Sequence, residues 1–204
     1  MAARRVDPER VARKREQITV EAARLFATQG YDRTSVADIA RAVGVSQASI
    51  FYYFTDKAAL FRAIFERDLP AAEALIARHV DAEEPVQAIL GVLDGLAEDA
   101  ADPGASGMLV ELLRRVEHDP ALIDVVTRTA EVLTGGLAAL IARGIADGDI
   151  DAALDPVETA TWLQAIVDAT YLNARPGRSP LPELRRTVLG YLAPHTQHGG
   201  ELHD

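Results

Sequence analysis

The sequence predicts an all-α protein of about nine helices, and three observations support this fold class. Apolar residues recur at intervals of three and four along almost the whole chain of 204 residues, as on the buried faces of amphipathic helices. Proline and glycine separate these stretches, and none of them alternates in the manner of a β-strand. Hydrophobic residues make up 49% of the chain and charged residues 25%, which is an ordinary globular composition.

The first helix is predicted between Asp7 and Gly30. Asp7 can cap its N-terminus, Pro8 suits its first position, and Gly30 ends it. Apolar residues at helical spacing predict further helices in the segments 60–64, 86–96, 109–116, 122–141, 163–167 and 181–192. Breakers separate these segments at Pro70, Pro85, Pro103, Pro120, Gly148 and Pro156 and within 176–182. Pro70 is expected either to kink or to end the fourth helix.

The composition and the motifs exclude several classes of protein. The chain has no cysteine, which excludes disulfide frameworks, thiolate zinc sites, iron–sulfur clusters and cysteine nucleophiles. No stretch approaches the roughly 18 uninterrupted apolar residues of a membrane span, and the N-terminal segment lacks the apolar middle of a secretory signal. No HExxH, GxSxG, GxGxxG or P-loop pattern is present. We therefore expect a cytoplasmic protein that is not an enzyme, needs no cofactor and does not bind a membrane.

Histidines near the C-terminus leave two interpretations open. His195, His198 and His203 follow the last predicted helix in a polar segment. A metal site there is one interpretation, and solvent-exposed histidines in a frayed segment are the more common case. No metal site is predicted.

The net charge of −10 is unevenly distributed along the chain. Residues 1–57 contain ten Arg and Lys against seven Asp and Glu, a net charge of +3, whereas residues 58–204 carry a net charge of −13. Such asymmetry is typical of a nucleic-acid-binding head on an acidic body. The alternative is that the small positive excess lies on solvated helix faces. We accordingly expect a binding domain at 1–57 and a second domain at 58–204.

Residues 34–57 carry the spacing of a helix-turn-helix. Ser35 and Asp38 match a capping box, in which each side chain accepts a hydrogen bond from the other residue's backbone N–H, so a helix begins here. Two helices that cross at about 90 to 120° need a small residue at the crossing, and Ala40 supplies it. Gly44 tolerates a positive φ in the turn, and Ile50 is the apolar anchor of the second helix.

The outer face of this second helix favours a nucleic-acid partner. An αα-hairpin in an ordinary core explains the apolar positions equally well, but it does not explain the small, neutral or aromatic outer positions, which are Gln47, Ala48, Ser49, Tyr52 and Tyr53. Solvated helices more often carry Glu, Lys and Arg there. In a major groove, glutamine can pair with adenine edges, serine with several edges, and the alanine methyl group can touch a thymine methyl group. The tyrosine hydroxyls can donate to phosphates.

Two further features favour a phosphate partner. Lys57 lies in the first turn of the next helix, behind the expected cap Asp56, where the helix dipole mildly disfavours a cation unless an anion binds it. The four aromatic residues at 51–54 cannot all be buried on one helix face, so at least one is expected to be exposed or bound.

Residues from about 13 to 60 resemble the N-terminal domain of the TetR family of bacterial transcriptional regulators. In that family a long first helix ends in Gly-Tyr, followed by Thr-[Thr/Ser]-Val-x-[Asp/Glu]-Ile-Ala, Gly-Val-Ser, an aromatic cluster and a lysine. The matching segments are Gly30 and Tyr31, Thr34 to Ala40, Gly44 to Ser46, Phe51 to Phe54, and Lys57. The rest of the chain is similar to the family only in its layout, which implies a helical domain for ligand binding and dimerisation.

The resemblance implies a DNA interface around the third helix. The DNA-binding residues expected from it are Thr34, Ser35, Ser46, Gln47, Ala48, Ser49, Phe51, Tyr52, Tyr53 and Lys57. Gln47, Ala48 and Ser49 fall where the family reads bases. Thr34, Lys57 and one of the two tyrosines fall where the family contacts phosphates.

This chain departs from the family pattern at two positions. Phe51 stands where a tyrosine is usual, which removes a hydroxyl that often holds a phosphate. Ala37 stands where some members have a base-reading arginine, so specificity is expected to depend on the third helix alone. Arginines near the N-terminus are expected to touch the DNA backbone or minor groove, with a solubilising tail as the alternative for the first two: Arg4, Arg5, Arg10, Arg13 and Arg15.

By resemblance, the chain is a ligand-responsive repressor that binds a near-palindromic DNA operator as a homodimer and is released by a small-molecule effector. Dimerisation is expected through helices at about 156–173 and 181–192, and effector binding within residues 70–175. Candidate pocket residues are Met108, Glu111, Trp162 and Tyr171, each of which is more often an ordinary core or interface residue. The alternative function is a small-molecule-binding or protein-interaction module with a degenerate helix-turn-helix that does not bind DNA.

Overall fold

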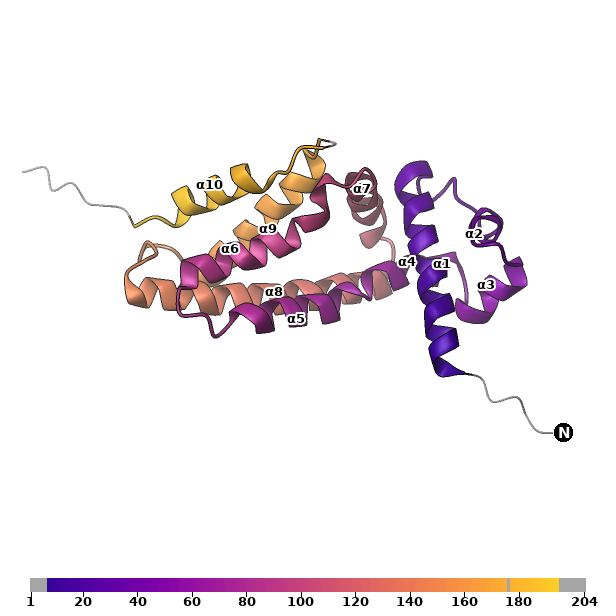
Figure 1. The fold of residues 1–204 in the computed structure, drawn as a ribbon, viewed down its shortest axis with the longest axis horizontal. Coiled ribbons are helices and arrows are strands. Elements are labelled where there is room, and N and C mark those ends of the chain that lie inside the picture. Colours follow the sequence, from indigo (N-terminus) through magenta and orange to yellow (C-terminus); the bar gives the residue numbers. More distant parts are fainter. Residues whose placement is uncertain (1–6, 176, 195–204) are drawn as a thin grey trace, which may run out of the picture. The chain divides into compact units, whose positions relative to one another are not determined.

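The computed structural model describes residues 7–175 and 177–194, and within these residues the chain is all-α (Figure 1). It forms ten α-helices, α1 to α10, and a short 3-10 helix, η1. The described ranges contain no β-strand, and Arg175 and Arg178 form an isolated bridge. The predicted fold class is confirmed.

The chain divides into two compact units. The first contains the chain up to Ala71 together with Ala101–Ala130, and the second contains Ala72–Ala100 and the chain from Glu131 onward. These units do not coincide with the boundary expected at residue 57, because α4, α7 and the first turns of α8 pack into the core around the N-terminal helix. A functional boundary at residue 57 stays a prediction.

In the first unit, α1 (Pro8–Gln29) is the helix around which the others assemble. Three helices contact it, namely α2 (Val36–Val43), α4 (Lys57–Phe65) and α7 (Ala105–Val116), and α3 (Gln47–Tyr53) contacts α2. Four aromatic rings meet in this core at centroid distances of 5.2 to 5.4 Å: Phe26, Tyr31, Phe61 and Phe65. Leu122 of α8 (Pro120–Asp147) is fully buried in the same core.

Local sequence explains where α1 begins and ends. The Asp7 carboxylate accepts a hydrogen bond from the Glu9 N–H at 3.1 Å, and Pro8 occupies the first helical position. Gly30 follows the helix at φ +86°, and its N–H donates to the Phe26 carbonyl at 2.9 Å. Both predicted ends of this helix are confirmed.

The structure shows how the chain accommodates Pro70. Helix α4 ends at Phe65, and α5 (Asp68–His79) begins after a short break. Pro70 therefore lies in the first turn of α5, where its missing N–H would have had no partner within the helix. The fourth helix ends before Pro70 and does not continue through it as a kink.

In the second unit, three helices contact one another: α6 (Pro85–Leu96), α9 (Pro156–Leu172) and α10 (Leu181–Leu192). Helix α6 is followed by η1 (Glu98–Ala101). Together with parts of α5 and α8 they enclose a core that includes Leu75, Leu93, Leu140, Leu163 and Val188. The Arg143 guanidinium donates to the Val80 and Ala82 carbonyls at 2.8 and 2.6 Å, which ties α8 to the end of α5.

Helix α8 is long and apolar. An 18-residue stretch within its 28 residues has a mean hydropathy of 1.4, so by length and composition it is the one helix in the described ranges that could cross a membrane. Core helices of water-soluble proteins pass the same test. Leu137, Leu140 and Ile141 of α8 are buried in the core of the second unit, and 28% of the 18-residue stretch is buried.

Candidate nucleic-acid interface

The turn between α2 and α3 has helix-turn-helix geometry. Ala40, 3% exposed, lies on the buried side of α2, and Gly44 ends that helix in the left-handed conformation at φ +72°. Ser46 caps α3 by accepting a hydrogen bond from the Ser49 N–H at 3.1 Å. Ile50, 1% exposed, anchors α3 in the core. The predicted helix-turn-helix spacing is confirmed.

A complete capping box begins α2. The Ser35 hydroxyl accepts from the Asp38 N–H at 3.2 Å, and the Ser35 N–H donates to the Asp38 carboxylate at 3.0 Å. Arg41 donates to the other carboxylate oxygen at 2.9 Å. Hydrogen bonds from Ser35, and then the bond and charge of Arg41, lower the pKa of Asp38 from 3.8 to about 2.

The lowered pKa of Asp38 predicts how this capping box responds to acid. Because the folded-state pKa lies below the ordinary value, the carboxylate contributes its full stabilisation above about pH 4 and loses it as the pH falls toward 2. The free energy of unfolding of Asp38→Asn, measured by urea denaturation, is therefore expected to lie below that of the wild type at neutral pH. The two values should converge as the pH falls through this window.

The matched control for this prediction is Asp124→Asn, which changes an exposed carboxylate on α8. It shows the effect of removing one exposed carboxylate elsewhere in the first unit under the same conditions. A gap between Asp38→Asn and the wild type that is independent of pH would show that the Asp38 carboxylate does not stabilise α2 through its charge.

Four side chains form the exposed face of α3, which we call the α3 face: Gln47, Ala48, Phe51 and Tyr52. Their positions i, i+1, i+4 and i+5 place them on one side of the helix. Phe51 is 50% exposed and Tyr52 is 66% exposed, which confirms that the aromatic cluster is not buried as a whole. The α3 face carries no charged side chain.

The remaining aromatic residues of the cluster support α3 from behind. The partly buried Tyr53 ring meets the Tyr52 ring edge-on at 5.0 Å, and Phe54 is buried. The Arg15 guanidinium lies 4.3 Å from the centre of the Phe54 ring and donates to the Tyr53 carbonyl at 2.8 Å. Arg15 therefore stabilises the end of α3, and its expected contact with DNA stays a prediction.

Two of the expected phosphate contacts face inward. The Thr34 side chain is fully buried, and its hydroxyl donates to the Gly30 carbonyl at 2.8 Å, so this geometry does not present it to a phosphate. Lys57 Nζ donates to the Tyr31 carbonyl at 2.9 Å and to the Thr34 carbonyl at 3.1 Å. The same ammonium lies 4.0 Å from the centre of the Tyr31 ring.

These contacts explain why a cation lies in the first turn of α4. Partial burial lowers the pKa of Lys57 below its ordinary value. The negative charge of Asp32 raises this pKa, and the positive charge of Arg115 lowers it further. Two carbonyls and an aromatic face compensate for the unfavourable helix dipole, so the position of Lys57 requires no phosphate. An ammonium has three N–H donors, and two are used here, which leaves one for a phosphate.

Helix α7 holds the turn between α1 and α2, a contact that the sequence analysis missed. The Glu111 carboxylate accepts from the Tyr31 N–H at 3.0 Å, and the Arg115 guanidinium lies 3.6 Å from the centre of the Tyr31 ring. Gly107 approaches α1 so closely that a Cβ atom there would lie 2.2 Å from the Ala27 carbonyl oxygen. No sequence pattern links these partners, because the members of each pair are at least 80 positions apart.

The four candidate pocket residues are divided between the two units. Met108 and Glu111 lie on α7 in the first unit, where Met108 packs against the core. Trp162 and Tyr171 lie on α9 in the second unit. Trp162 is 54% exposed, and the Tyr171 hydroxyl donates to the Leu96 carbonyl at 2.7 Å. A shared role of these residues in ligand binding stays a prediction.

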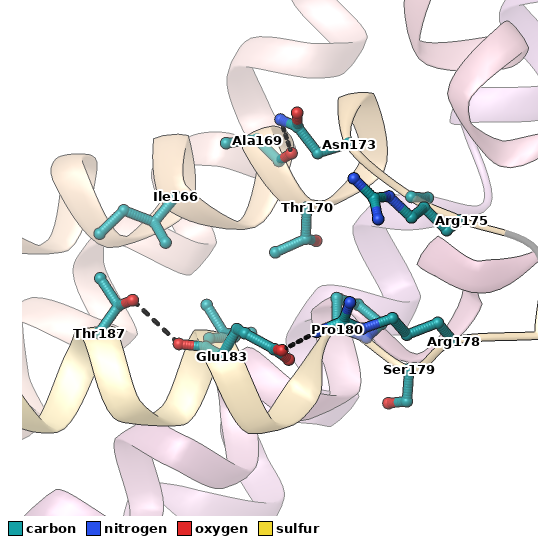
Figure 2. Close-up of a pocket in the computed structure, with 12 residues that line it drawn as sticks. Ile166, Ala169, Thr170, Asn173, Arg175, Arg178, Ser179, Pro180, Glu183 and Thr187 are labelled. Atoms are coloured by element: carbon teal, nitrogen blue, oxygen red, sulfur yellow. Dashed lines mark hydrogen bonds and ion pairs between the residues drawn. The ribbon is translucent and has the colours of Figure 1, made fainter.

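A cavity of about 290 Å³ opens in the second unit between the end of α9, the connecting segment and α10 (Figure 2). Ile166 and Leu184 contribute apolar wall, and Arg175 reaches over it from the connecting segment. Arg178 and Glu183 form an ion pair at its edge. None of the four candidate pocket residues lines this cavity.

Some of the expected features lie outside the described residues, namely Arg4, Arg5, His195, His198 and His203. Arg10 and Arg13 are described and exposed, and Arg13 pairs with Glu9 at 3.2 Å. Within the described ranges, no cluster of three or more His, Asp or Glu side chains could hold a metal ion.

This chain is similar in sequence to known bacterial transcriptional regulators. Residues 18–64 match the sequence profile of bacterial regulatory proteins of the tetR family. The HTH-type transcriptional regulator TcmR of Streptomyces glaucescens is 35% identical over 141 residues, which cover 65% of this chain and 61% of TcmR. The match therefore spans less than two thirds of that relative's length.

Solved structures share the fold over most of the chain. A TetR-family transcriptional regulator from Agrobacterium tumefaciens superposes with a TM-score of 0.75 at 24% identity, covering 90% of this chain and 99% of its own. AibR, in complex with isovaleryl coenzyme A and operator DNA, superposes with a TM-score of 0.72 at 20% identity, covering 90% of this chain and 100% of its own.

The fold and the α3 face together define a helix-turn-helix protein with an all-helical second unit. Its helix-turn-helix segment is the part that matches the family profile. Residues 18–64 are thus a helix-turn-helix segment of the tetR family of bacterial regulatory proteins, as the motifs between residues 13 and 60 predict.

Proposed function

We propose that this protein is a transcriptional repressor that inserts the α3 face into the major groove of a DNA operator. The composition of the α3 face carries the proposal, because it joins the amide of Gln47 to the apolar groups of Ala48 and Phe51 without any charge. Water-exposed helix faces usually carry charged side chains, whereas base edges in the major groove offer amide partners and thymine methyl groups. The related TcmR, a transcriptional regulator by its name, supports the assignment.

Phosphate contacts are proposed around the α3 face. Ser46, before the first turn of α3, has an exposed hydroxyl that can donate to a phosphate. The Ser35 hydroxyl and N–H both donate to the Asp38 carboxylate, so a phosphate contact there would have to replace one of these bonds. Ser49, Tyr52 and Tyr53 supply further hydroxyls, and Lys57 supplies its remaining donor.

A homodimer is proposed to bind two half-sites of a near-palindromic operator. Half-sites one helical turn apart, roughly 34 to 36 Å, require two recognition helices related by two-fold symmetry. Helices α9 and α10 carry large apolar side chains that are exposed in the single chain: Val157, Trp162, Leu172 and Leu189. Their exposure supports dimerisation through these two helices, because a second copy would bury this apolar surface.

A small-molecule effector is proposed to bind within residues 70–175 and to release the repressor from DNA. Such release requires the effector to bind the DNA-bound and free states with different affinities. AibR has a similar fold and was solved in complex with isovaleryl coenzyme A and operator DNA. This supports the proposal that a protein of this fold binds both a small molecule and DNA. We propose that the protein acts in the cytoplasm, without a cofactor and without enzymatic activity.

Selection of bound fragments from random duplex DNA tests this function. A palindromic consensus is expected at moderate salt. Gln47→Ala is expected to lower the affinity for the consensus duplex by about 5- to 100-fold. It should also relax the base preference at one base pair of each half-site. Lys57→Ala is expected to lower the affinity for all duplexes alike. The slope of log affinity against log salt concentration should become shallower by the amount that corresponds to about one phosphate contact.

Gln29→Ala, an exposed glutamine at the end of α1, is the matched control and should leave the consensus unchanged. Because Lys57 also binds two carbonyls, the unfolding of Lys57→Ala is measured in parallel. Absence of any enriched sequence, together with weak salt dependence, would overturn the proposal in favour of a protein-interaction module. The buried Thr34 and the occupied Lys57 are the observations that favour this second function.

A further inference from the structure

Phe51 is the unusual aromatic residue of this protein. The chain has five phenylalanines, and the other four are at most 7% exposed, namely Phe26, Phe54, Phe61 and Phe65. Phe51 is 50% exposed, in the middle of the α3 face. Exposing half of a phenyl ring to water is unfavourable by the hydrophobic effect, so a partner that covers it would gain affinity.

The ring of Phe51 is free of aromatic and cationic neighbours throughout the described part of the chain. The three aromatic residues that follow it in the sequence do have such partners, because Tyr52 and Tyr53 pack edge-on against each other. Phe54 is covered by the guanidinium of Arg15. Since a phenyl ring has no hydrogen-bonding group, Phe51 cannot replace a tyrosine as a phosphate ligand.

We propose that Phe51 is a specificity-determining residue that recognises thymine through its C5-methyl group. This inference rests on the proposed insertion of the α3 face into a major groove. The thymine methyl is the apolar group that base pairs display on that groove edge, and contact with phenylalanine buries both surfaces. Phenylalanine at position 51 therefore loses the phosphate contact that a tyrosine hydroxyl could make and gains a contact with a base.

The geometry of α3 limits where this thymine lies. Phe51 follows Gln47 by four residues, which places it one turn along the same face, about 6 Å further along the helix axis at 1.5 Å per residue. Base pairs stack about 3.4 Å apart. The thymine recognised by Phe51 is therefore expected within about two base pairs of the base recognised by Gln47.

Replacing thymine by deoxyuridine tests the inference, because it removes the methyl group and leaves base pairing unchanged. Each thymine of the selected operator is replaced in turn, in both half-sites, and the dissociation constant is measured. At one position per half-site, the replacement is expected to weaken binding of the wild type by about fourfold, which corresponds to the free energy of burying one methyl group. Phe51→Ala should bind the unmodified operator more weakly and should be insensitive to deoxyuridine at that position.

Tyr52→Ala is the matched control, because it removes the neighbouring exposed aromatic residue from the same face. It should keep the full sensitivity to deoxyuridine at the Phe51 position. Thermal unfolding of Phe51→Ala and Tyr52→Ala checks that both variants fold, as expected for substitutions at exposed positions.

The outcomes separate this inference from the proposed function. An operator whose recognition depends on Gln47, but whose sensitivity to deoxyuridine is the same in the wild type and in Phe51→Ala, would overturn the role of Phe51 and leave the repressor assignment intact. Failure to select any operator would overturn the proposed function itself. Loss of sensitivity confined to one thymine per half-site in Phe51→Ala would establish the contact.

Discussion

Replacing Arg62 by alanine is expected to lower the free energy of unfolding of the first unit by about 3 to 5 kcal/mol. Arg62 Nη1 donates to the Asp119 carboxylate at 2.8 Å, and Asp119 is 8% exposed. Its other oxygen accepts from the Leu122 N–H at 3.2 Å at the start of α8. Without Arg62, a buried carboxylate would keep its backbone donor and lose its cation, which is far more costly than the loss of an exposed pair.

Urea denaturation measures this change, with the transition of the first unit followed separately if the two units unfold apart. Arg67→Ala is the matched control, because Arg67 pairs with Glu16 at 3.1 Å with both side chains 50% exposed. Its cost is expected to be below about 1 kcal/mol. The double variant Arg62→Ala/Asp119→Asn should be more stable than Arg62→Ala alone, and equal costs for Arg62→Ala and Arg67→Ala would contradict the prediction.

The second large effect is expected from Gly107→Ala, which should destabilise the first unit by about 3 kcal/mol. The added Cβ would lie 2.2 Å from the Ala27 carbonyl oxygen and 3.1 Å from its carbon, both of which are backbone atoms. Neither can rotate away, so α7 must move off α1. That movement also strains the hydrogen bond between Glu111 and the Tyr31 N–H, because Glu111 follows Gly107 by one turn of the same helix.

Gly135→Ala separates this steric effect from helix propensity. Gly135 also lies inside an α-helix, α8, and a Cβ there would have no neighbour within 4 Å. Alanine is therefore expected to stabilise the protein by about 0.5 to 1 kcal/mol. Thermal and urea unfolding of both variants measure the difference, and a Gly107→Ala protein at least as stable as the wild type would show that the α1–α7 contact can relax.

The helix-turn-helix is the part of the structure that the sequence predicts best. Ser35 with Asp38, Gly44 and Ser46 each act within four residues of their partners, so their spacing alone encodes the geometry. The burial of Thr34 depends on a carbonyl at Gly30 and on the packing around it. A hydroxyl next to a helix start is equally compatible with a phosphate contact and with an internal hydrogen bond, and the surrounding fold decides between them.

Long-range contacts explain the remaining differences. The Glu111 carboxylate holds the backbone of Tyr31 across 80 positions, a contact that no spacing in the sequence predicts, and its role in a ligand pocket stays a prediction. The boundary expected at residue 57 followed the change in charge, and as a functional boundary it stays a prediction. The compact units instead follow the apolar core that joins α1 to α7 and to the start of α8.

Positive charge in this protein is carried almost entirely by arginine, since Lys14 and Lys57 are the two lysines among 21 basic residues. Acetylation and other amine chemistry leave guanidinium groups untouched. Within the helix-turn-helix, such chemistry can act at Lys57 alone, and the carbonyls of Tyr31 and Thr34 hold that amine in place. Acylation of Lys57 would therefore require its ammonium first to leave both carbonyls, which belong to the turn that links α1 to α2.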